Sequence, residues 1–409
     1  MNRFSGSRRG AKPEGVSAVG TDPAPCFFFM LKRFVSFYFI CSALCSLSAC
    51  GGGGSSDAQP NYHDPTQPIP PYFSPDGTPS GNGPYQPQGA GAVLQGEPNF
   101  AKLVIAHPQA QVTHTPWAGY WWPYAEGGTS NACDRIEQSH GASGAINWEI
   151  NNHGPSAPGI QSWWGHCNGW AAASTLFVEP QTTYTDASGI DFKIGDQKAA
   201  LSEIAMEVHA ESFGHRANSD DSTSLDFQDV FPDQFFLVMM NVVGLGNPLI
   251  MDRYTGSQVW NQPIVAYQLD PITPSDYIGA DPSAPNVYRV EVTMTVWWAS
   301  DNVTSEHVSE AFAWSDGPSY ESRVYRFELW LDAPVVFDAT GSVVSSGNVV
   351  LNHQGDYVLG GDWKMSDSNP VDSYPDYLWI VHDIAPSSGY SNPHLDQAWI
   401  TSRFGKRLR

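Results

Sequence analysis

Basic residues are scarce in this chain. Its 409 residues include 20 Lys and Arg against 42 Asp and Glu, which gives a formal net charge of −22 at pH 7. A surface with this charge repels nucleic acids and anionic lipid head groups. The sequence also lacks a phosphate-binding glycine loop and a basic groove with interleaved aromatic residues. These absences argue against nucleic acid as a partner.

Known metal-binding motifs are missing as well. The sequence contains no H-E-x-x-H and no paired C-x-x-C, which are typical of zinc sites. The acidic segment 218–226 lacks the glycine and the terminal glutamate of an EF-hand loop. We interpret this segment as a solvated loop, and the sequence itself assigns no residue to a metal.

Cysteine is sparse, with six residues in the whole chain. Of these, Cys133 and Cys167 lie in the part that we expect to fold. One interpretation joins the two in a disulfide, which an oxidising cell envelope would permit. The other leaves Cys133 buried and Cys167 reactive, and the residues around Cys167 favour this second interpretation.

The first 98 residues do not resemble a folded domain. Residues 30–50 place two basic residues before a short apolar run that ends in Leu47-Ser-Ala-Cys50, the layout of a bacterial signal peptide with a lipobox. The run is too short and too interrupted for a transmembrane anchor. We therefore predict that Cys50 is lipidated and becomes the first residue of the mature protein, with Met30 as the true start.

This interpretation divides the chain into three parts. Residues 1–49 are an upstream extension and signal peptide, residues 50–98 are the lipidated Cys and a flexible Gly/Pro-rich linker, and residues 99–409 form one domain. We expect a protein attached to the membrane through its lipid, in the bacterial cell envelope or at the cell surface. Gly51, which follows the lipidated cysteine, favours the outer membrane.

Hydrophobic periodicity assigns the folded part to the α+β class. Residues 196–208 repeat apolar positions at helical spacing, with Asp196 as the expected N-cap. Residues 289–296 and 325–331 alternate apolar and polar side chains, which is typical of strands with one wet face. Further short strands fit residues 345–350 and 377–382. Helices thus come first, and an antiparallel sheet fills the C-terminal part.

One cysteine stands directly before a helix-forming run. The segment Gln161-Ser-Trp-Trp-Gly-His-Cys167-Asn-Gly-Trp170 precedes the run 171–177. A cysteine at a helix start faces the N–H groups of the first turn, and the positive end of the helix dipole favours its thiolate, the nucleophilic form. We therefore predict Cys167 as the nucleophile of an acyl transfer that passes through a thioester.

The residues around Cys167 resemble those of papain-like enzymes. Gln161 lies six residues before Cys167, the offset at which those enzymes carry a glutamine whose amide helps to bind the oxyanion. Their chain order of Cys, His and then Asp or Asn makes Asp252 the candidate that orients the base. A turn residue that caps the backbone is the alternative for Asp252. Spacing does not select the base among His166, His209, His215, His307, His353, His382 and His394.

Two motifs in the right order resemble the transglutaminase elicitor family. Residues 165–170 are similar to the nucleophile motif of that family, and Val259-Trp-Asn-Gln-Pro263 is similar to the core of the elicitor peptide of oomycete cell-wall transglutaminases. The resemblance runs from about Trp117 to Trp379. It implies a papain-like core and a protein-glutamine γ-glutamyltransferase, in which Cys167 takes the acyl group of a glutamine side chain and passes it to an amine. Calcium dependence is associated with the family.

The same resemblance leaves alternatives open. Trp260 and Trp164 would form a wall of the acyl-donor cleft, whereas the Trp260 motif could also be a strand edge at which Pro263 ends pairing. The catalytic histidine of the family matches Phe236 here, an apolar ring in place of a base. The alternatives are a catalytically impaired surface binding module on the same fold, and a cysteine peptidase or amidase that shares the thioester step.

Overall fold

The computed structural model describes residues 96–214, 230–253, 258–282, 286–349, 361–364 and 374–408. The predicted signal peptide, the lipidated Cys50, His215, His353 and the acidic segment 218–226 lie outside the described residues. Predictions for those positions therefore stay predictions.

The described residues form seven α-helices, two 3-10 turns and thirteen strands. The helical elements are α1 (Phe100–Ala106), η1 (Tyr124–Glu126), α2 (Ser130–His140), α3 (Ala145–His153), α4 (Cys167–Leu176), α5 (Ile194–Ile204), α6 (Pro232–Val242), η2 (Val243–Leu245) and α7 (Gln397–Phe404). The strands are β1 (Gln109–Gln111), β2 (Tyr184–Thr185), β3 (Asp191–Phe192), β4 (Val208–Gly214), β5 (Ile250–Asp252), β6 (Asn261–Leu269), β7 (Tyr277–Ala280), β8 (Tyr288–Ala299), β9 (Tyr320–Leu331), β10 (Val336–Phe337), β11 (Val343–Ser345), β12 (Asp362–Trp363) and β13 (Tyr377–Ile384).

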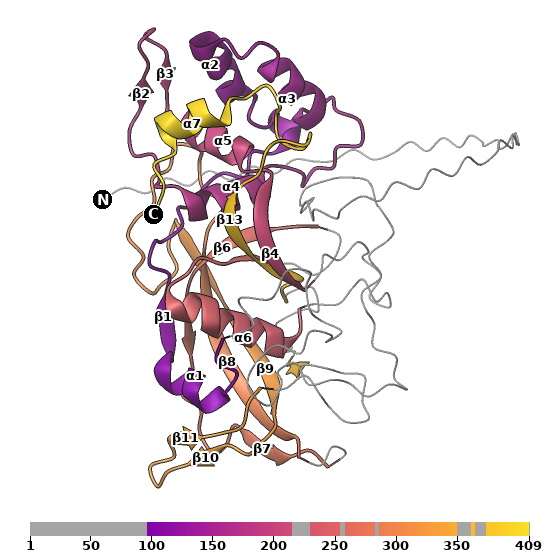
Figure 1. Ribbon diagram of the computed structural model, residues 1–409, viewed down its shortest axis with the longest axis vertical. Helices are drawn as coiled ribbons and strands as arrows, with labels where there is room; N and C mark the ends of the chain where they lie inside the picture. The colour runs from indigo at the N-terminus through magenta and orange to yellow at the C-terminus, as the bar shows by residue number, and fades with distance from the viewer. Residues whose placement is uncertain are drawn as a thin grey trace, which may run out of the picture. The chain divides into compact units, whose positions relative to one another are not determined.

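A single large antiparallel sheet organises these elements. Its strand order is β12-β9-β8-β6-β5-β13-β4, with β1 beside β6 and β7 beside β8. The long hairpin of β8 and β9 pairs over its whole length, from Tyr288 opposite Leu331 to Ala299 opposite Tyr320. Figure 1 shows α2, α3, α5 and α7 gathered beyond the β4 and β13 end, and α1 and α6 over the β8 and β9 part. The mixed class of helices and antiparallel sheet is thereby confirmed.

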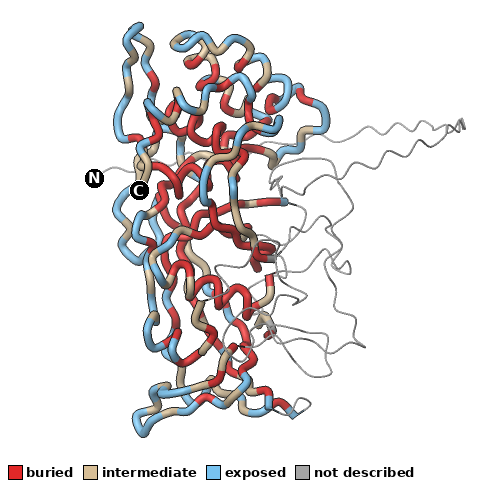
Figure 2. The backbone as a smooth tube through the Cα atoms, viewed as in Figure 1, coloured by how far each residue is buried: buried red, intermediate tan, exposed pale blue. Residues whose placement is uncertain are grey.

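Both faces of the sheet are buried. Successive residues of a strand point to opposite faces, so each strand contributes side chains to two cores. In β13, Trp379 belongs to the core that includes residues of α4, α5 and α7, while its neighbour Leu378 belongs to the core that includes residues of α1 and α6. In β5, Ile250 and Met251 divide between the two cores in the same way. The buried tube in Figure 2 accordingly runs through the sheet and through α4 and α6. Helix α4 therefore lies in one core and α6 in the other, on opposite faces of the sheet.

Helix α4 is enclosed on all sides. Every residue of this helix, Cys167–Leu176, is buried, as expected for a helix that lacks a polar face. At Gly169 an added Cβ would lie 2.2 Å from the backbone oxygen of Ser202 in α5, so glycine permits the close approach of the two helices. The predicted helix start at Cys167 is confirmed, and tight packing on all sides fixes the position of this cysteine.

The predicted helix at residues 196–208 is present but shifted. Helix α5 covers Ile194–Ile204, and Asp196 lies at its third position, where its carboxylate accepts the N–H of Lys193 at 3.0 Å. Asp196 as the N-cap is therefore wrong, because its side chain serves the reciprocal half of a capping box. Val208 and His209 belong to strand β4 instead. The helices-first order holds only in part, since α6 and α7 follow strands.

Helix α6 places Phe236 in the core that lacks Cys167. Pro232 opens the helix, as proline suits a first helical position. The Phe236 ring is fully buried and lies 5.7 Å from the Phe100 ring and 6.3 Å from the Phe327 ring, centroid to centroid. Its partners belong to α1 and β9, in the core opposite α4. Phe236 is thus a packing residue, and its position says nothing about a base beside Cys167.

Asp233, the second residue of α6, is expected to make stability depend on pH. Burial raises the pKa of this fully buried carboxyl to about 8, against backbone N–H contacts that lower it. Because the folded-state pKa exceeds the unfolded value of about 3.9, stability falls as pH rises from about 4 to 8, by up to about 1.4 kcal/mol per unit. The neutral variant Asp233→Asn should therefore stabilise the protein increasingly over this range, measured by urea unfolding at each pH. An equal gain at pH 4 and pH 8 would contradict this.

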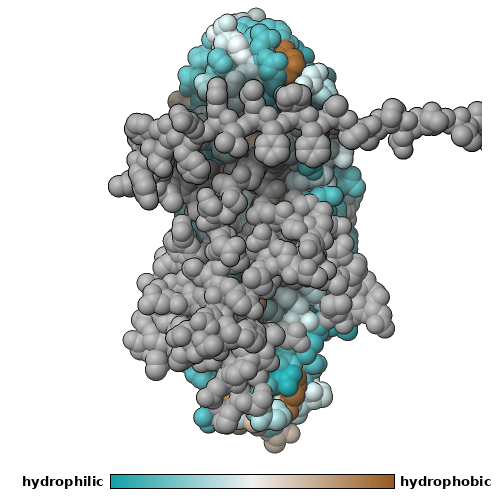
Figure 3. Space-filling model, turned by 90° about the vertical axis from the view of Figure 1, so that its right-hand side faces the viewer, coloured by the Kyte–Doolittle hydropathy of each residue, from teal (hydrophilic) through white to brown (hydrophobic). Residues whose placement is uncertain are grey.

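Within the described residues, no helix combines the length and the apolar character that crossing a membrane requires. Where described residues show at the face turned to the viewer in Figure 3, most of them are hydrophilic. This surface agrees with the acidic composition of the chain.

Candidate active site

The thiol of Cys167 lies in the first turn of α4. His166 is the N-cap residue of this helix, and Cys167 is its first helical residue. Cys167 Sγ donates to the backbone oxygen of Val259 at 3.6 Å, and the residue is only 1% exposed. A glutamine side chain can reach the sulfur only if the residues above it move apart.

Asp252 ends strand β5, near the middle of the sheet. It is fully buried and lies in register with Tyr377 on β13 and Asn261 on β6. Its Oδ1 accepts a hydrogen bond from the Trp260 N–H at 2.8 Å. This N–H belongs to the same peptide group as the Val259 oxygen that receives the Cys167 thiol. The structure thus brings Cys167 and Asp252 to the two ends of one peptide group.

The polar residues of the Trp260 motif are held by partners inside the fold. Asn261 Oδ1 accepts from the Trp379 indole at 2.9 Å and from the Tyr377 hydroxyl at 3.3 Å. Gln262 Nε2 donates to Asp301 at 2.8 Å. Pro263 pairs with Ile250 inside the β5–β6 ladder. The expectation that Pro263 ends pairing is therefore wrong. The hydrogen bonds of the two buried amides hold this motif, and with it the peptide group beside Cys167, in a fixed position.

Partly exposed tryptophans occur at this peptide group and in the segment before Cys167. The Trp260 ring meets the Trp121 ring edge to face, with centroids 5.5 Å apart. Backbone hydrogen bonds tie the Trp121 segment to that of Cys167, since the Trp121 oxygen accepts from the His166 N–H at 2.7 Å. Trp164 is also partly exposed and packs its ring on that of Trp163. A role of Trp260 and Trp164 in a substrate cleft stays a prediction.

The remaining predicted site residues lie in several places. Gln161 is exposed, and its Oε1 accepts from the Trp163 indole at 2.6 Å; its role at the oxyanion stays a prediction. His209, His382 and His394 are exposed. The ring of His307 lies 2.8 Å from the Ser319 hydroxyl. These positions give no geometric reason to prefer one of these histidines as the base.

The alternative of a disulfide between Cys133 and Cys167 is excluded, because each residue carries a thiol. Cys133 lies in α2, where its Sγ faces the Thr129 hydroxyl at 3.9 Å and Asn392 Nδ2 at 3.7 Å. Burial raises the pKa of the Cys133 thiol well above its usual range, and the nearby carboxylates of Glu149 and Glu203 raise it further. Cys133 is therefore a buried, protonated thiol, as predicted for a structural cysteine.

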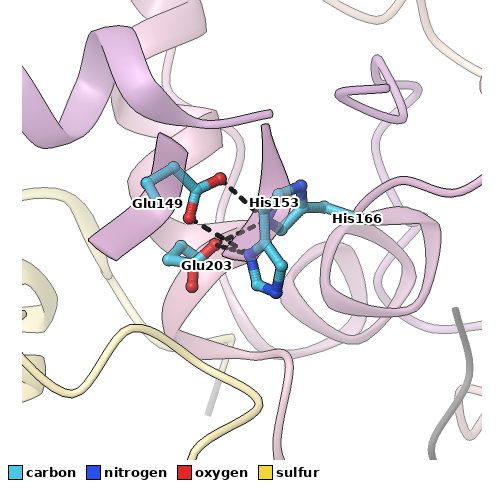
Figure 4. A group of neighbouring side chains, drawn as sticks. All are labelled: Glu149, His153, His166 and Glu203. Carbon is cyan, nitrogen blue, oxygen red and sulfur yellow. Dashed lines mark hydrogen bonds and ion pairs between the residues drawn. The ribbon is translucent and has the colours of Figure 1, made fainter. Parts of the chain in front are cut away.

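A second constellation lies at the N-terminal end of α4. Its members are Glu149 and His153 of α3, His166 before α4, and Glu203 of α5, all buried, with one ligating atom of each within 4.8 Å of the others. Figure 4 shows the four side chains converging. His166 Nε2 lies 2.6 Å from Glu203 Oε2 and 3.3 Å from Glu149 Oε1. His153 Nδ1 lies 3.1 Å from Glu149 Oε2 and 3.9 Å from Glu203 Oε2. We call these residues the His/Glu cluster.

The charges of the His/Glu cluster determine the pKa of His166. Burial lowers the pKa of His166, but the carboxylates of Glu203 and Glu149 outweigh this and raise it to about 9. Burial raises the pKa of Glu203, but the charge and hydrogen bond of His166, the charge of His153 and the Asn392 N–H together outweigh burial, so that the net shift is downward. Without another cation, His166 therefore carries the positive charge that the buried carboxylates need.

Sequence reasoning missed the His/Glu cluster. Its residues come from α3, from the position just before α4 and from α5, and the first and last, Glu149 and Glu203, are 54 positions apart in the chain. The one local signal is the spacing of Glu149 and His153, four residues apart and therefore on one face of a helix. That spacing is common without any ligand, so only the fold shows which other residues join the pair.

Comparisons with known proteins agree with this architecture. Residues 129–316 match the family described as transglutaminase elicitor. Among solved structures, the fold is similar to the crystal structure of the GP42 transglutaminase from Phytophthora sojae. The TM-score is 0.50 with 16% sequence identity, over 75% of this chain and 92% of that chain. No curated protein matches the chain.

The fold and the segment around Cys167 thus define a transglutaminase-like protein. Residues 129–316, which include both the Cys167 motif and the Trp260 motif, match the transglutaminase elicitor family. At this level of identity, the likeness to the solved structure concerns the fold.

Proposed function

We propose that this protein is a protein-glutamine γ-glutamyltransferase with a papain-like core. In the first step the Cys167 thiolate attacks the carbonyl carbon of a glutamine side chain, and ammonia leaves with a proton. In the second step a primary amine attacks the thioester, forms an amide and returns the sulfur as thiolate or thiol. Water in place of the amine would convert the glutamine into glutamate.

The shared peptide group is the observation that best supports this proposal. It receives the thiol of Cys167 through the Val259 oxygen and donates to Asp252 through the Trp260 N–H. The residues that resemble the elicitor peptide therefore adjoin the residues that resemble a catalytic pair. Helix α4 packs on β6 and β13 of the antiparallel sheet, which supports the proposal of a papain-like core.

The general base has no assigned residue among those described. Strand β4 ends at Gly214, which lies opposite Tyr377, and Tyr377 lies opposite Asp252 on its other side. Gly214 is thus level with Asp252, with β13 between them. His215 follows Gly214 in the sequence, which makes His215→Ala the first histidine substitution to test.

The buried thiol favours a second candidate function. Cys167 is 1% exposed and in contact with a backbone oxygen, which would suit a surface binding module that retains the fold without turnover. An enzyme must open this site, whereas a binding module need not.

Amine incorporation distinguishes these functions. The full chain is incubated with a glutamine-bearing protein and a fluorescent primary amine, with calcium or with a chelator. Incorporated label would support a transglutaminase, and release of ammonia without label would indicate an amidase. The absence of both products, together with failure of iodoacetamide to modify Cys167, would overturn the enzyme proposal in favour of a binding module.

The variant Asp252→Asn is expected to lower the rate of amine incorporation by about 10²–10⁴-fold. The amide oxygen can still accept the Trp260 N–H, but it cannot stabilise a protonated base as a carboxylate does. The measurement is kcat/KM for the amine reaction, with Tm as a check on folding. A loss of less than about tenfold at unchanged Tm would remove Asp252 from the proposed machinery.

We also propose that lipid on Cys50 anchors the protein at the bacterial cell envelope, with the outer membrane favoured. The support is the lipobox-like sequence before Cys50. The variant Cys50→Ala should move the protein from the membrane fraction to the soluble fraction in cells. Equal membrane association of both forms would contradict the anchor.

A further inference from the structure

The His/Glu cluster buries two carboxylates beside two imidazoles. Glu149 and Glu203 are both fully buried, and carboxylates are rarely buried without a paired cation or a coordinated metal. The only imidazoles in the cluster belong to His153 and His166, whose ring centroids lie 4.9 Å apart. A divalent cation would balance both carboxylates at once, and one ligating atom of each of the four residues already lies within 4.8 Å of the others.

Hydrogen bonding fixes the ring of His166 in the orientation of a ligand. Its Nδ1 lies 3.2 Å from the backbone oxygen of Trp122. A carbonyl oxygen only accepts, so Nδ1 carries a proton and donates it. In the neutral ring Nε2 then presents a lone pair to the two carboxylates, and it makes no hydrogen bond of good geometry in the described part of the chain. A backbone carbonyl that holds the outer nitrogen is the usual support of a metal-bound histidine.

The backbone around the cluster is shaped to hold these groups. Trp122, whose oxygen accepts from His166, has a φ of 42°, a conformation that costs energy for a large residue and is concentrated at functional sites. Gly128 has a φ of 56°, and an added Cβ there would lie 2.4 Å from Glu149 Oε1. The chain thus accepts unusual conformations at two positions that face the cluster.

The carboxylates also have supporting donors. The Thr129 N–H donates to Glu149 at 2.8 Å, and the Thr129 hydroxyl donates to Glu203 at 3.1 Å. The Asn392 N–H donates to the other oxygen of Glu203 at 2.7 Å. Each carboxylate is therefore oriented by the protein and retains an oxygen that faces the imidazoles. This arrangement matches the outer shell of a closed metal site.

We propose that the four side chains of the His/Glu cluster bind one Zn²⁺ ion, which fixes the N-terminal end of α4. Two nitrogen and two carboxylate ligands suit tetrahedral zinc, whose ligand atoms lie about 3.3 Å apart at bond lengths near 2.0–2.2 Å. The N···O separations in the cluster are 2.6, 3.1, 3.3 and 3.9 Å, with Glu149 presenting a different oxygen to each imidazole, and they lie around that value. Calcium prefers six to eight oxygen ligands at longer distances. A calcium dependence of activity would therefore have to come from a different site.

The zinc would not take part in the reaction at Cys167. All four ligand positions are occupied by protein side chains, which is typical of a structural site. The link to the nucleophile is positional, because His166 is both a ligand and the residue directly before Cys167. The zinc proposal stands independently of the transferase proposal, since metal content and stability can be measured whether or not the protein transfers acyl groups.

The first test is the metal content of the purified full chain after dialysis against a weak chelator, measured by inductively coupled plasma mass spectrometry. About one zinc per chain is expected for the wild type and less than about one tenth for Glu203→Gln. The matched control is His140→Asn, because His140 pairs with Asp396 on the surface, outside the cluster; it should retain full zinc. Zinc near zero in the wild type, or unchanged in Glu203→Gln, would overturn the proposal.

A second test covers the case in which Glu203→Gln does not fold. The wild-type chain is stripped with a strong chelator, and Tm is followed as ZnSO₄ or CaCl₂ is added back. Zinc should raise Tm by roughly 5 °C or more at micromolar concentration, while calcium should not reproduce this shift. Cobalt added to the stripped chain should give the intense visible bands of a tetrahedral ion. No zinc-dependent shift together with no such bands would overturn the site.

Discussion

Replacement of Cys167 by alanine is expected to lower the rate of amine incorporation by at least about 10³-fold, because the proposed thioester forms on its sulfur. The side chain lost is small, and α4 should tolerate alanine at its first position. The measurement is incorporation of a fluorescent primary amine into a glutamine-bearing protein, compared at equal protein concentration and with Tm recorded for each chain.

Cys133→Ala is the matched control for this experiment. Cys133 is as buried as Cys167, but burial and nearby carboxylates keep its thiol protonated. The control should retain the wild-type rate within a few-fold. If Cys167→Ala retained the wild-type rate, or if Cys133→Ala lost as much activity, the assignment of the nucleophile would be wrong.

Truncation of Glu203 to alanine is expected to reduce the free energy of unfolding by about 3–5 kcal/mol. The carboxylate is fully buried, and it receives the Asn392 N–H at 2.7 Å and lies 2.6 Å from His166. Its removal leaves these groups without their acceptor and opens a cavity between α3, α4 and α5. Urea unfolding at neutral pH measures the loss.

The control for this loss is Lys102→Ala. Lys102 pairs with Glu97 at 3.0 Å, but its side chain is 69% exposed. Water screens such pairs, so this variant should leave the free energy of unfolding nearly unchanged. Equal losses in the two variants would mean that the His/Glu cluster contributes no more than a surface ion pair.

Local patterns predicted the parts of the fold that local physics determines. The start of α4 at Cys167 and the strands of the β8–β9 hairpin follow from periodicity in short windows. The error at Asp196 arose because a carboxylate can serve at the N-cap or three residues later, and composition does not separate the two positions. Helix α7 escaped prediction because its short sequence has a weak pattern.

Non-local features required the structure. The motif at Cys167 and the motif at Trp260 stand about 90 residues apart in the sequence, and only the pairing of β5 with β6 and the packing of α4 bring them to one peptide group. The resemblance to a family showed that both motifs matter without showing how they meet. The His/Glu cluster had neither signal, since its four residues belong to no motif of known spacing.

The peptide group between Val259 and Trp260 couples the two parts of the candidate active site. Its oxygen contacts the sulfur of Cys167, and its N–H contacts the carboxylate of Asp252. Any rotation of this peptide plane that frees the sulfur also withdraws the N–H from Asp252. Exposure of the thiol and release of the carboxylate therefore share one free-energy cost, so a substrate that stabilises the rotated plane would prepare both groups in a single cooperative event.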